Sequence, residues 1–160
     1  MTSAEQTPDH AVAQAAREGK GDYSLFGNHH IAEYEATGGE VGYIWNGAPC
    51  LVLTTTGEKS GQLRKYALIF GRTGPEDRDV VVVASKGGFP EHPQWYRNLL
   101  AHPAVEVQVR ADKWHGVART ANAEERAELW PMMNEIWPSY DDYQAGTDRQ
   151  IPVVIISPSD

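Results

Sequence analysis

"CLVLTTTGEKSGQLRKYALIFGR", residues 50–72, is the stretch that decides the fold. Two runs of aliphatic, aromatic and β-branched residues flank a turn that contains Gly57 and Gly61, which predicts two antiparallel strands joined by a hairpin. A further strand-like run, "VGYIW", precedes the turn at Asn46–Gly47, and another, "VVVVASKGG", begins at Val80. The centre of the chain is therefore expected to form a series of short antiparallel strands.

The second half of the chain mixes helix and strand patterns. "EHPQWYRNLLAHP" predicts a helix with Pro93 in its first turn and Pro103 at its end, and "AVEVQV" predicts a strand with alternating valines. "WHGVART" is expected to pair back onto that strand, and "IPVVII" predicts a last strand. Between them, Asn122 and Glu125 predict a capping box at the start of a helix, which Pro131 should kink or divide.

These elements predict a mainly β fold with peripheral helices, in which the strands form an antiparallel barrel. A doubly wound α/β fold is less favoured, because the helices do not alternate with the strands. We expect one domain over residues 23–160, preceded by a polar leader, residues 1–22, that should be mobile. A first helix should begin near Ser24 and stop at Gly38–Gly39.

Composition argues against several classes of protein. The formal net charge of −8 argues against a general nucleic-acid binder, which needs a broad basic face. The longest apolar runs are too short to span a membrane, and no hydrophobic signal segment is visible. A single cysteine, Cys50, rules out an internal disulfide and fits a reducing compartment, so we expect a cytoplasmic protein.

The glycine turn carries an unusual charge for an acidic protein. The stretch quoted above holds four cations against one anion, Glu58; the cations are Lys59, Arg64, Lys65 and Arg72. Its two glycines permit backbone N–H groups to converge on an anion, and the fork of an arginine suits phosphate. On the turn alone, an anion-binding site and an ordinary solvated hairpin tip are equally good interpretations.

Two more features are candidates for chemistry. "ASKGG" places Ser85 and Lys86 where the chain leaves an apolar strand, although glycine turns of this kind are common. Trp137, Tyr140 and Tyr143 are spaced three residues apart, so a helical segment would place them along one side. Aromatic stripes usually pack in a core. The polar sequence around this one instead favours a surface segment that presents rings and hydroxyls to a ligand.

Signatures of metal and nucleophile chemistry do not emerge from the sequence. The histidines are either adjacent or far apart, so no metal-ligand spacing is present and we predict no metal site. Cys50 lies in or beside an apolar strand and is expected to be unreactive. There is also no G-x-S-x-G nucleophile elbow.

Four motifs occur in order along the chain: "TGEKSG", "ASKGG", "PQWYRNL" and "YDDYQAGTDRQ". Together they resemble the deazaflavin-dependent nitroreductase family of flavin and deazaflavin oxidoreductases, and the likeness runs from about Gly39 to Ser157. The resemblance implies an antiparallel split β-barrel of the FMN-binding type. It also implies that the chain binds the 8-hydroxy-5-deazaflavin coenzyme F-420, which carries hydride, and reduces a quinone, a nitroaromatic or another activated acceptor.

The resemblance implies roles for particular residues. The phosphate and anionic tail of the coenzyme would be bound by Lys59, Ser60, Gln62 and Arg64. The ring and ribityl region would be lined by Ala84, Ser85, Lys86 and Gly87, with Trp95 and Asn98 nearby. The catalytic hydroxyls would be those of Tyr140 and Ser85. The acceptor pocket would contain Ile69, Trp137, Tyr140 and Tyr143.

Three positions depart from the pattern of the relatives. Glu58 stands where many relatives carry a basic residue, and Ile69 and Trp137 each replace a tyrosine, which predicts a more apolar acceptor pocket. Two other functions stay open: an FMN-dependent split-barrel oxidoreductase, and a non-catalytic protein that binds or stores the coenzyme. The sequence allows a homodimer and a peripheral membrane contact without deciding either.

Overall fold

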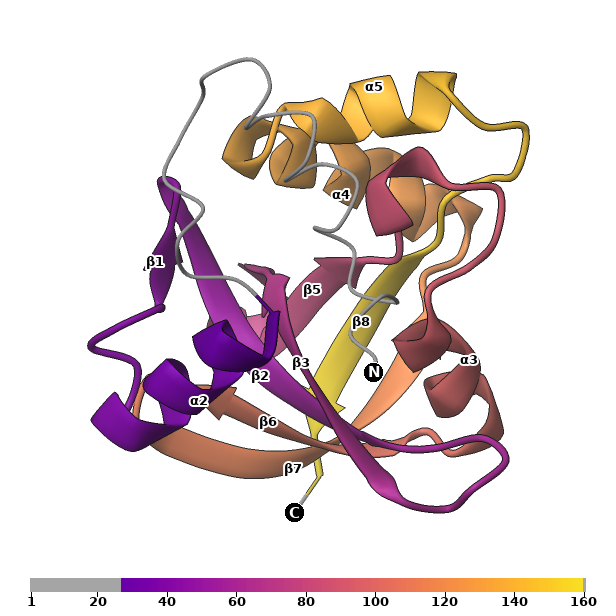
Figure 1. The fold of residues 1–160 in the computed structure, drawn as a ribbon. Helices are drawn as coiled ribbons and strands as arrows, with labels where there is room; N and C mark the ends of the chain where they lie inside the picture. Colours follow the sequence, from indigo (N-terminus) through magenta and orange to yellow (C-terminus); the bar gives the residue numbers. More distant parts are fainter. Residues whose placement is uncertain (1–26, 160) are drawn as a thin grey trace.

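The computed structural model describes residues 27–159 and shows a curled β-sheet flanked by helices (Figure 1). The strands are β1 (Ile44–Trp45), β2 (Ala48–Thr56), β3 (Leu63–Ile69), β4 (Gly71–Thr73), β5 (Asp79–Val83), β6 (Ala104–Val109), β7 (Asp112–Thr120) and β8 (Val153–Pro158). The helices are α2 (Gly27–Thr37), α3 (Gln94–Ala101), α4 (Ala123–Ile136) and α5 (Ser139–Ala145), with short 3-10 turns η2 (Pro75–Asp77) and η3 (Lys86–Gly88). The predicted leader, residues 1–22, and the expected helix start near Ser24 lie outside the described residues.

The strands pair antiparallel throughout the described sheet. Their order is β1-β2-β6-β7-β8-β5-β4, and β3 pairs with β2. The predicted hairpin is present, since β2 and β3 pair from Thr56 opposite Leu63 to Cys50 opposite Ile69. The prediction of a mainly β, antiparallel fold with peripheral helices is therefore confirmed.

One predicted strand, residues 65–72, is divided into β3 and β4 at Phe70. The Phe70 side chain is only 2% exposed, and its N–H donates to the carbonyl of Pro49 at 3.1 Å. Beyond this point β4 pairs with β5 instead of β2. At the break the chain therefore changes from pairing with β2 to pairing with β5, which helps to curl the sheet around its core.

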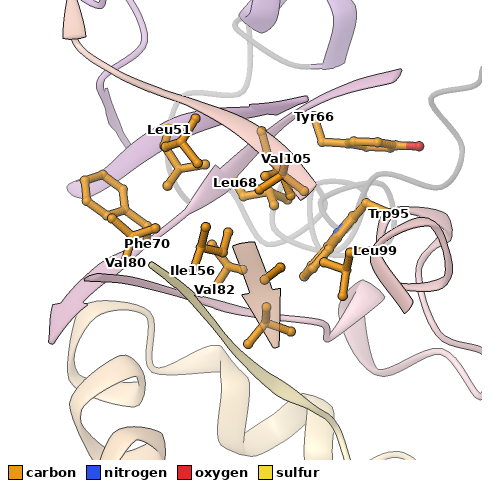
Figure 2. Packing of buried hydrophobic residues seen from close by; sticks show 14 of the residues in the cluster. Leu51, Tyr66, Leu68, Phe70, Val80, Val82, Trp95, Leu99, Val105 and Ile156 are labelled. Carbon is orange, nitrogen blue, oxygen red and sulfur yellow. The ribbon is translucent and has the colours of Figure 1, made fainter. Parts of the chain in front are cut away.

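The main hydrophobic core lies between the strands and helix α3 (Figure 2). Leu51 of β2, Leu68 of β3 and Val82 of β5 meet there, and Trp95 and Leu99 of α3 close one side. Each of these side chains is at most 4% exposed. Burial of side chains of this size contributes about 1.5–3 kcal/mol each, so this cluster stabilises the packing of α3 against the strands.

Strand β5 faces two cores at once. Val80 and Val82 belong to the main core, whereas Val81 and Val83 pack with Met133 in a second cluster under α4 and α5. Figure 1 shows these two helices lying together on one side of the sheet. A strand that is buried on both faces has no polar positions to alternate with, which explains the unbroken valine run.

The ends of helices α2 and α4 follow sequence signals. Helix α2 ends before Gly38–Gly39, which have φ of 63° and 84°, as the predicted stop required. The predicted capping box opens α4: Asn122 Oδ1 accepts the N–H of Glu125, and the Glu125 carboxylate accepts the N–H of Asn122, both at 2.9 Å. The helix is not divided at Pro131, which is exposed; the division comes at Trp137–Pro138.

Candidate functional site

A hollow of about 290 Å³ opens beside the turn between β2 and β3. The tip of this hairpin and helix α3 form its walls. It is lined by Gly57, Glu58, Lys59, Ser60, Arg64, Gln94, Arg97 and Asn98. The structure thus brings four predicted coenzyme residues together (Lys59, Ser60, Arg64 and Asn98), whereas the exposed Gln62 is not among the lining residues.

The glycine turn is held by hydrogen bonds within itself. Gly57 N–H donates to the Gln62 carbonyl at 2.8 Å, and Gly61 N–H donates to the Gly57 carbonyl at 3.0 Å. Gln62 N–H donates to Ser60 Oγ at 3.1 Å. Gly61 has a φ of 72°, which favours glycine, and a Cβ at Gly57 would lie 2.6 Å from Ser60 Oγ. Within residues 27–159 no hydrogen bond occupies the N–H groups of Lys59 and Ser60, so these two amides are the ones available to an anion.

Asn98 anchors this turn from beneath and is itself fully buried. Its Oδ1 accepts the backbone N–H of Glu58 at 3.0 Å and Nε2 of Gln94 at 2.9 Å. Its Nδ2 donates to Thr55 Oγ1 at 2.9 Å and lies 3.5 Å from the Tyr66 hydroxyl. The side chain that was predicted to contact the coenzyme therefore supports the turn, because both ends of its amide are already used.

The four cations of the quoted stretch separate in space. Lys59 and Arg64 line the hollow, but Lys65 forms an ion pair with Glu35, and the Arg72 guanidinium lies over the ring of Phe70 at 5.4 Å. The third cation that lines the hollow is Arg97, which lies on helix α3 and outside the quoted stretch. Sequence reasoning missed this residue, although its place three residues after Gln94 puts both side chains on one face of the helix.

The second glycine loop has an uncommon backbone. Lys86, Gly87 and Gly88 have consecutive positive φ values of 47°, 62° and 84°. Such a conformation is strained for a lysine and persists where the surroundings hold it. A Cβ at Gly88 would lie 2.8 Å from the carbonyl oxygen of Tyr143, so α5 packs directly on this loop. The loop with predicted coenzyme residues and the helix with predicted acceptor residues are thus in contact.

Arg149 holds the second loop through its guanidinium. Nε donates to the carbonyl of Phe89 at 2.9 Å, Nη1 to that of Ala84 at 3.2 Å, and Nη2 to that of Ser85 at 2.7 Å. Nη1 also lies 3.1 Å from Nδ1 of His92, which must therefore be the unprotonated ring nitrogen. Burial and the nearby charge of Arg149 lower the pKa of His92. The sequence motif contains Arg149, but no role followed from its position.

Gln144 connects the Arg149 segment to helix α4. Its Nε2 donates to the carbonyl of Arg149 at 2.8 Å, and its Oε1 accepts the N–H of Ile151 at 2.9 Å. Arg126 donates through Nη2 to the same Oε1 at 3.0 Å and through Nε to the Ile151 carbonyl at 3.0 Å. The two helices and the second glycine loop therefore form one hydrogen-bonded unit.

Tyr140 is buried, which corrects the surface position expected for it. It is 5% exposed and lies in the cluster under α4 and α5, while its polar neighbours Asp141 and Asp142 are exposed. Core packing of the ring outweighs the polar sequence because that polarity belongs to the solvent side of α5. Burial raises the pKa of Tyr140, and its hydroxyl has no hydrogen-bond partner among the described residues.

The other predicted acceptor residues are half-buried. Trp137 donates through Nε1 to the Tyr143 hydroxyl at 3.3 Å, and its ring lies 5.5 Å from that of Trp45. Ile69 lies on β3 opposite Cys50. The Cys50 thiol is 2% exposed, and burial raises its pKa to about 12, as expected for an unreactive cysteine.

Several predicted coenzyme residues are buried. Trp95 and Ala84 are fully buried, and Ser85 is 1% exposed. The indole Nε1 of Trp95 has no hydrogen-bond partner within the described part of the chain. In this arrangement Trp95 contributes by packing in the main core, where Figure 2 shows it beside Leu99.

The described residues form neither a metal cluster nor a membrane-spanning helix. Within residues 27–159 no group of three or more His, Cys, Asp or Glu side chains could hold a metal ion. No helix in that range is long and apolar enough to cross a bilayer.

The family model for F420H(2)-dependent quinone reductase matches residues 27–158. The chain belongs to this family. A quinone reductase of the same description from Mycobacterium tuberculosis is 39% identical over 132 residues, which are 80% of this chain and 87% of the relative. The solved F420-H2 dependent reductase FDR-A is 42% identical, has a TM-score of 0.61, and covers 68% of this chain and 94% of its own. A solved domain-swapped dimer is 34% identical, has a TM-score of 0.64, and covers 94% of this chain and 99% of its own.

Family membership confirms three expectations. These are the deazaflavin-dependent reductase class, the split-barrel type of fold, and coenzyme F-420 as the cofactor of the family. The match is to quinone reductases, so a quinone is the one of the expected acceptors that the family description names. The roles of individual residues are not tested by these similarities and stay predictions.

Proposed function

We propose that this protein is an oxidoreductase that uses the reduced deazaflavin coenzyme F-420 to reduce quinones. The observation that carries the proposal is the cationic hollow of a family member whose net charge is −8. A local cluster of positive charge in an acidic protein attracts an anionic ligand to that place rather than to the whole surface.

The residues around the hollow fit the anionic part of this coenzyme. Lys59, Arg64 and Arg97 supply three cations, and the amides of Lys59 and Ser60 are available as donors. Hydrogen bonds from charged donors to phosphate or carboxylate are stronger than those between neutral groups. When bound, the reduced deazaflavin supplies a hydride to the acceptor. The left-handed turn at Lys86 would present further backbone donors to the coenzyme.

Tyr140 is proposed as the group that polarises the acceptor. Its raised pKa keeps the phenol protonated at neutral pH, and its hydroxyl is not engaged by another described residue. A protonated phenol donates a hydrogen bond to a quinone oxygen, on which negative charge grows as the quinone is reduced. The same raised pKa opposes complete proton transfer, so Tyr140 acts as a hydrogen-bond donor and the proton of the product comes from water.

A titration of tryptophan fluorescence with coenzyme F-420, run beside FMN, tests the cofactor. We expect saturable quenching by F-420 in the micromolar range and binding of FMN that is weaker by roughly tenfold or more. Preferential binding of FMN would support the flavin-dependent alternative. Tight binding of F-420 with no reduction of any quinone would support the storage alternative.

A pair of matched double variants tests the hollow itself. Lys59→Ala with Arg64→Ala removes two lining cations and should weaken F-420 binding by roughly tenfold or more, at about 1.5–3 kcal/mol per charged hydrogen bond. Lys65→Ala with Arg72→Ala removes the same charge outside the hollow and should change the affinity little. Equal affinities of the two double variants would contradict the assignment.

We further propose a single domain over residues 23–160, a cytoplasmic location and a homodimer. The first is supported by a family match that spans residues 27–158, and the second by the single, buried, free cysteine. The homodimer is supported by the similarity to a domain-swapped dimer. Size-exclusion chromatography with light scattering measures the oligomeric state directly, and a monomer would contradict this part of the proposal.

A further inference from the structure

Glu58 is the only acidic side chain among the residues that line the cationic hollow. Its Oε1 accepts Nε2 of Gln94 at 3.2 Å and lies 3.7 Å from Nε of Arg97. Arg97 in turn donates through Nη2 to Gln94 Oε1 at 2.7 Å. The carboxylate thus engages one of the three cations that the hollow presents to an anion.

The backbone of Glu58 cannot easily move away from this position. Its N–H is held by Asn98, whose amide is fully buried, and the same Oδ1 also accepts Gln94 Nε2. A carboxylate on a fixed backbone can leave the hollow only by turning its own side chain. It therefore stays close to any anion that enters.

We propose that Glu58 is a specificity-determining residue that competes with anionic ligands for Arg97 and weakens the binding of polyanions to this hollow. The identification of the natural ligand as coenzyme F-420 rests on the proposed function, whereas the competition for Arg97 rests only on the contacts given above. A ligand that places several negative charges in the hollow meets the like charge of Glu58 and must also displace it from Arg97. A neutral ring that binds elsewhere in the site is not repelled by Glu58 and does not compete with it for Arg97.

The expected effect follows from one unit charge at close range. Near a protein surface, two like charges a few ångströms apart interact strongly enough for a change of about tenfold in affinity. Glu58→Gln keeps an oxygen that can accept Gln94 Nε2 but removes the charge. The tenfold gain should shrink as salt is added, because the Debye length is about 10 Å at 0.1 M ionic strength.

The test is isothermal titration calorimetry of three proteins: wild type, Glu58→Gln and the control Glu35→Gln. The control makes the same change in net charge, but Glu35 pairs with Lys65 outside the hollow. Each is titrated at low salt with tripolyphosphate, with coenzyme F-420, and with the ribityl deazaflavin that lacks phosphate and tail. We expect Glu58→Gln to bind tripolyphosphate and F-420 about tenfold more tightly than wild type, with no change for the ribityl deazaflavin.

The outcomes separate this inference from the proposed function. Equal tripolyphosphate affinity in wild type and Glu58→Gln, an equal gain in Glu35→Gln, or no tripolyphosphate binding at all would each overturn the inference. A gain for tripolyphosphate without any binding of F-420 would support it while contradicting the proposed function. A gain that is just as large for the ribityl deazaflavin, which lacks the phosphate and tail, would overturn it, because it would show that the charge of the phosphate and tail is not the cause.

Discussion

Replacement of Asn98 by alanine is the most informative perturbation of the first glycine turn. In the native protein this buried amide joins three elements: the turn through Glu58 N–H, strand β2 through Thr55 Oγ1, and helix α3 through Gln94. Alanine removes all of these ties at once. It also leaves a small void next to the main core, because Asn98 is 0% exposed.

The magnitude follows from the groups that lose a partner. The substitution breaks two hydrogen bonds of 2.9–3.0 Å, one to Thr55 Oγ1 and one from the N–H of Glu58. Each lost bond lowers the free energy of unfolding by about 1 kcal/mol, and by up to about 3 kcal/mol where a buried group is left unpaired. The contact with Tyr66 at 3.5 Å adds little. We therefore expect the free energy of unfolding to fall by about 2–4 kcal/mol.

Urea denaturation followed by tryptophan fluorescence measures this loss, and a titration with coenzyme F-420 measures its effect on the hollow. We expect F-420 affinity to fall because Lys59 and Ser60 lose the support that fixes their amides. Tyr66→Phe removes the 3.5 Å contact with Asn98 while leaving the other hydrogen bonds of Asn98 in place, and it serves as the comparison. If Asn98→Ala were destabilised no more than Tyr66→Phe and bound F-420 as tightly as wild type, Asn98 would not be the anchor of the turn.

Three further variants test other parts of the structure. Tyr140→Phe removes no hydrogen bond between described residues, so stability and F-420 affinity should change little while quinone turnover falls by about tenfold or more; equal turnover would reject its role. Arg149→Lys cannot reproduce the fork to three carbonyls and should lower both the urea midpoint and F-420 affinity, whereas the exposed Arg119→Lys should leave affinity unchanged. Burial lowers the pKa of His30, so the unfolded chain binds more protons than the folded one, and stability should fall as the pH drops below about 6.5. This acid loss should be smaller in His30→Gln, which keeps a donor for the Gly42 carbonyl; melting curves at pH 7.5 and 5.5 measure it.

The fold was largely readable from local patterns. Hairpin spacing around Gly57 and Gly61, and the capping box at Asn122, depend on contacts within a few residues, so the sequence contains nearly all the information that they need. The break between β3 and β4 at Phe70 could not be predicted from such local contacts. It depends on Phe70 entering a core built by distant strands and on an N–H bond to Pro49, neither of which has a local signature.

The sequence predicted part of the candidate site, and the wrong predictions have a common physical cause. Arg64 and Lys65 are consecutive on a strand, so they must face opposite sides, and only one of them could reach the hollow. Arg72 is eight residues beyond Arg64, a chain length of roughly 26 Å at about 3.3 Å per residue. These two exclusions were available before the structure. The presence of Arg97 at the hollow could not be predicted in this way, because it depends on the position of helix α3 beside the turn.

Asn98 and Arg149 share one physical task. A loop that leaves a sheet loses the regular partners of its backbone groups, and groups of that kind that are buried must find others. Asn98 supplies an acceptor for an amide of the first glycine loop, and Arg149 supplies donors for three carbonyls of the second. Because each side chain comes from a different part of the chain, the two loops can take their shape only after the barrel and its helices are in place. Asn98, which was predicted to contact the coenzyme, and Arg149, to which the sequence assigned no role, therefore both support the shape of a glycine loop, and neither position shows this task in the local sequence.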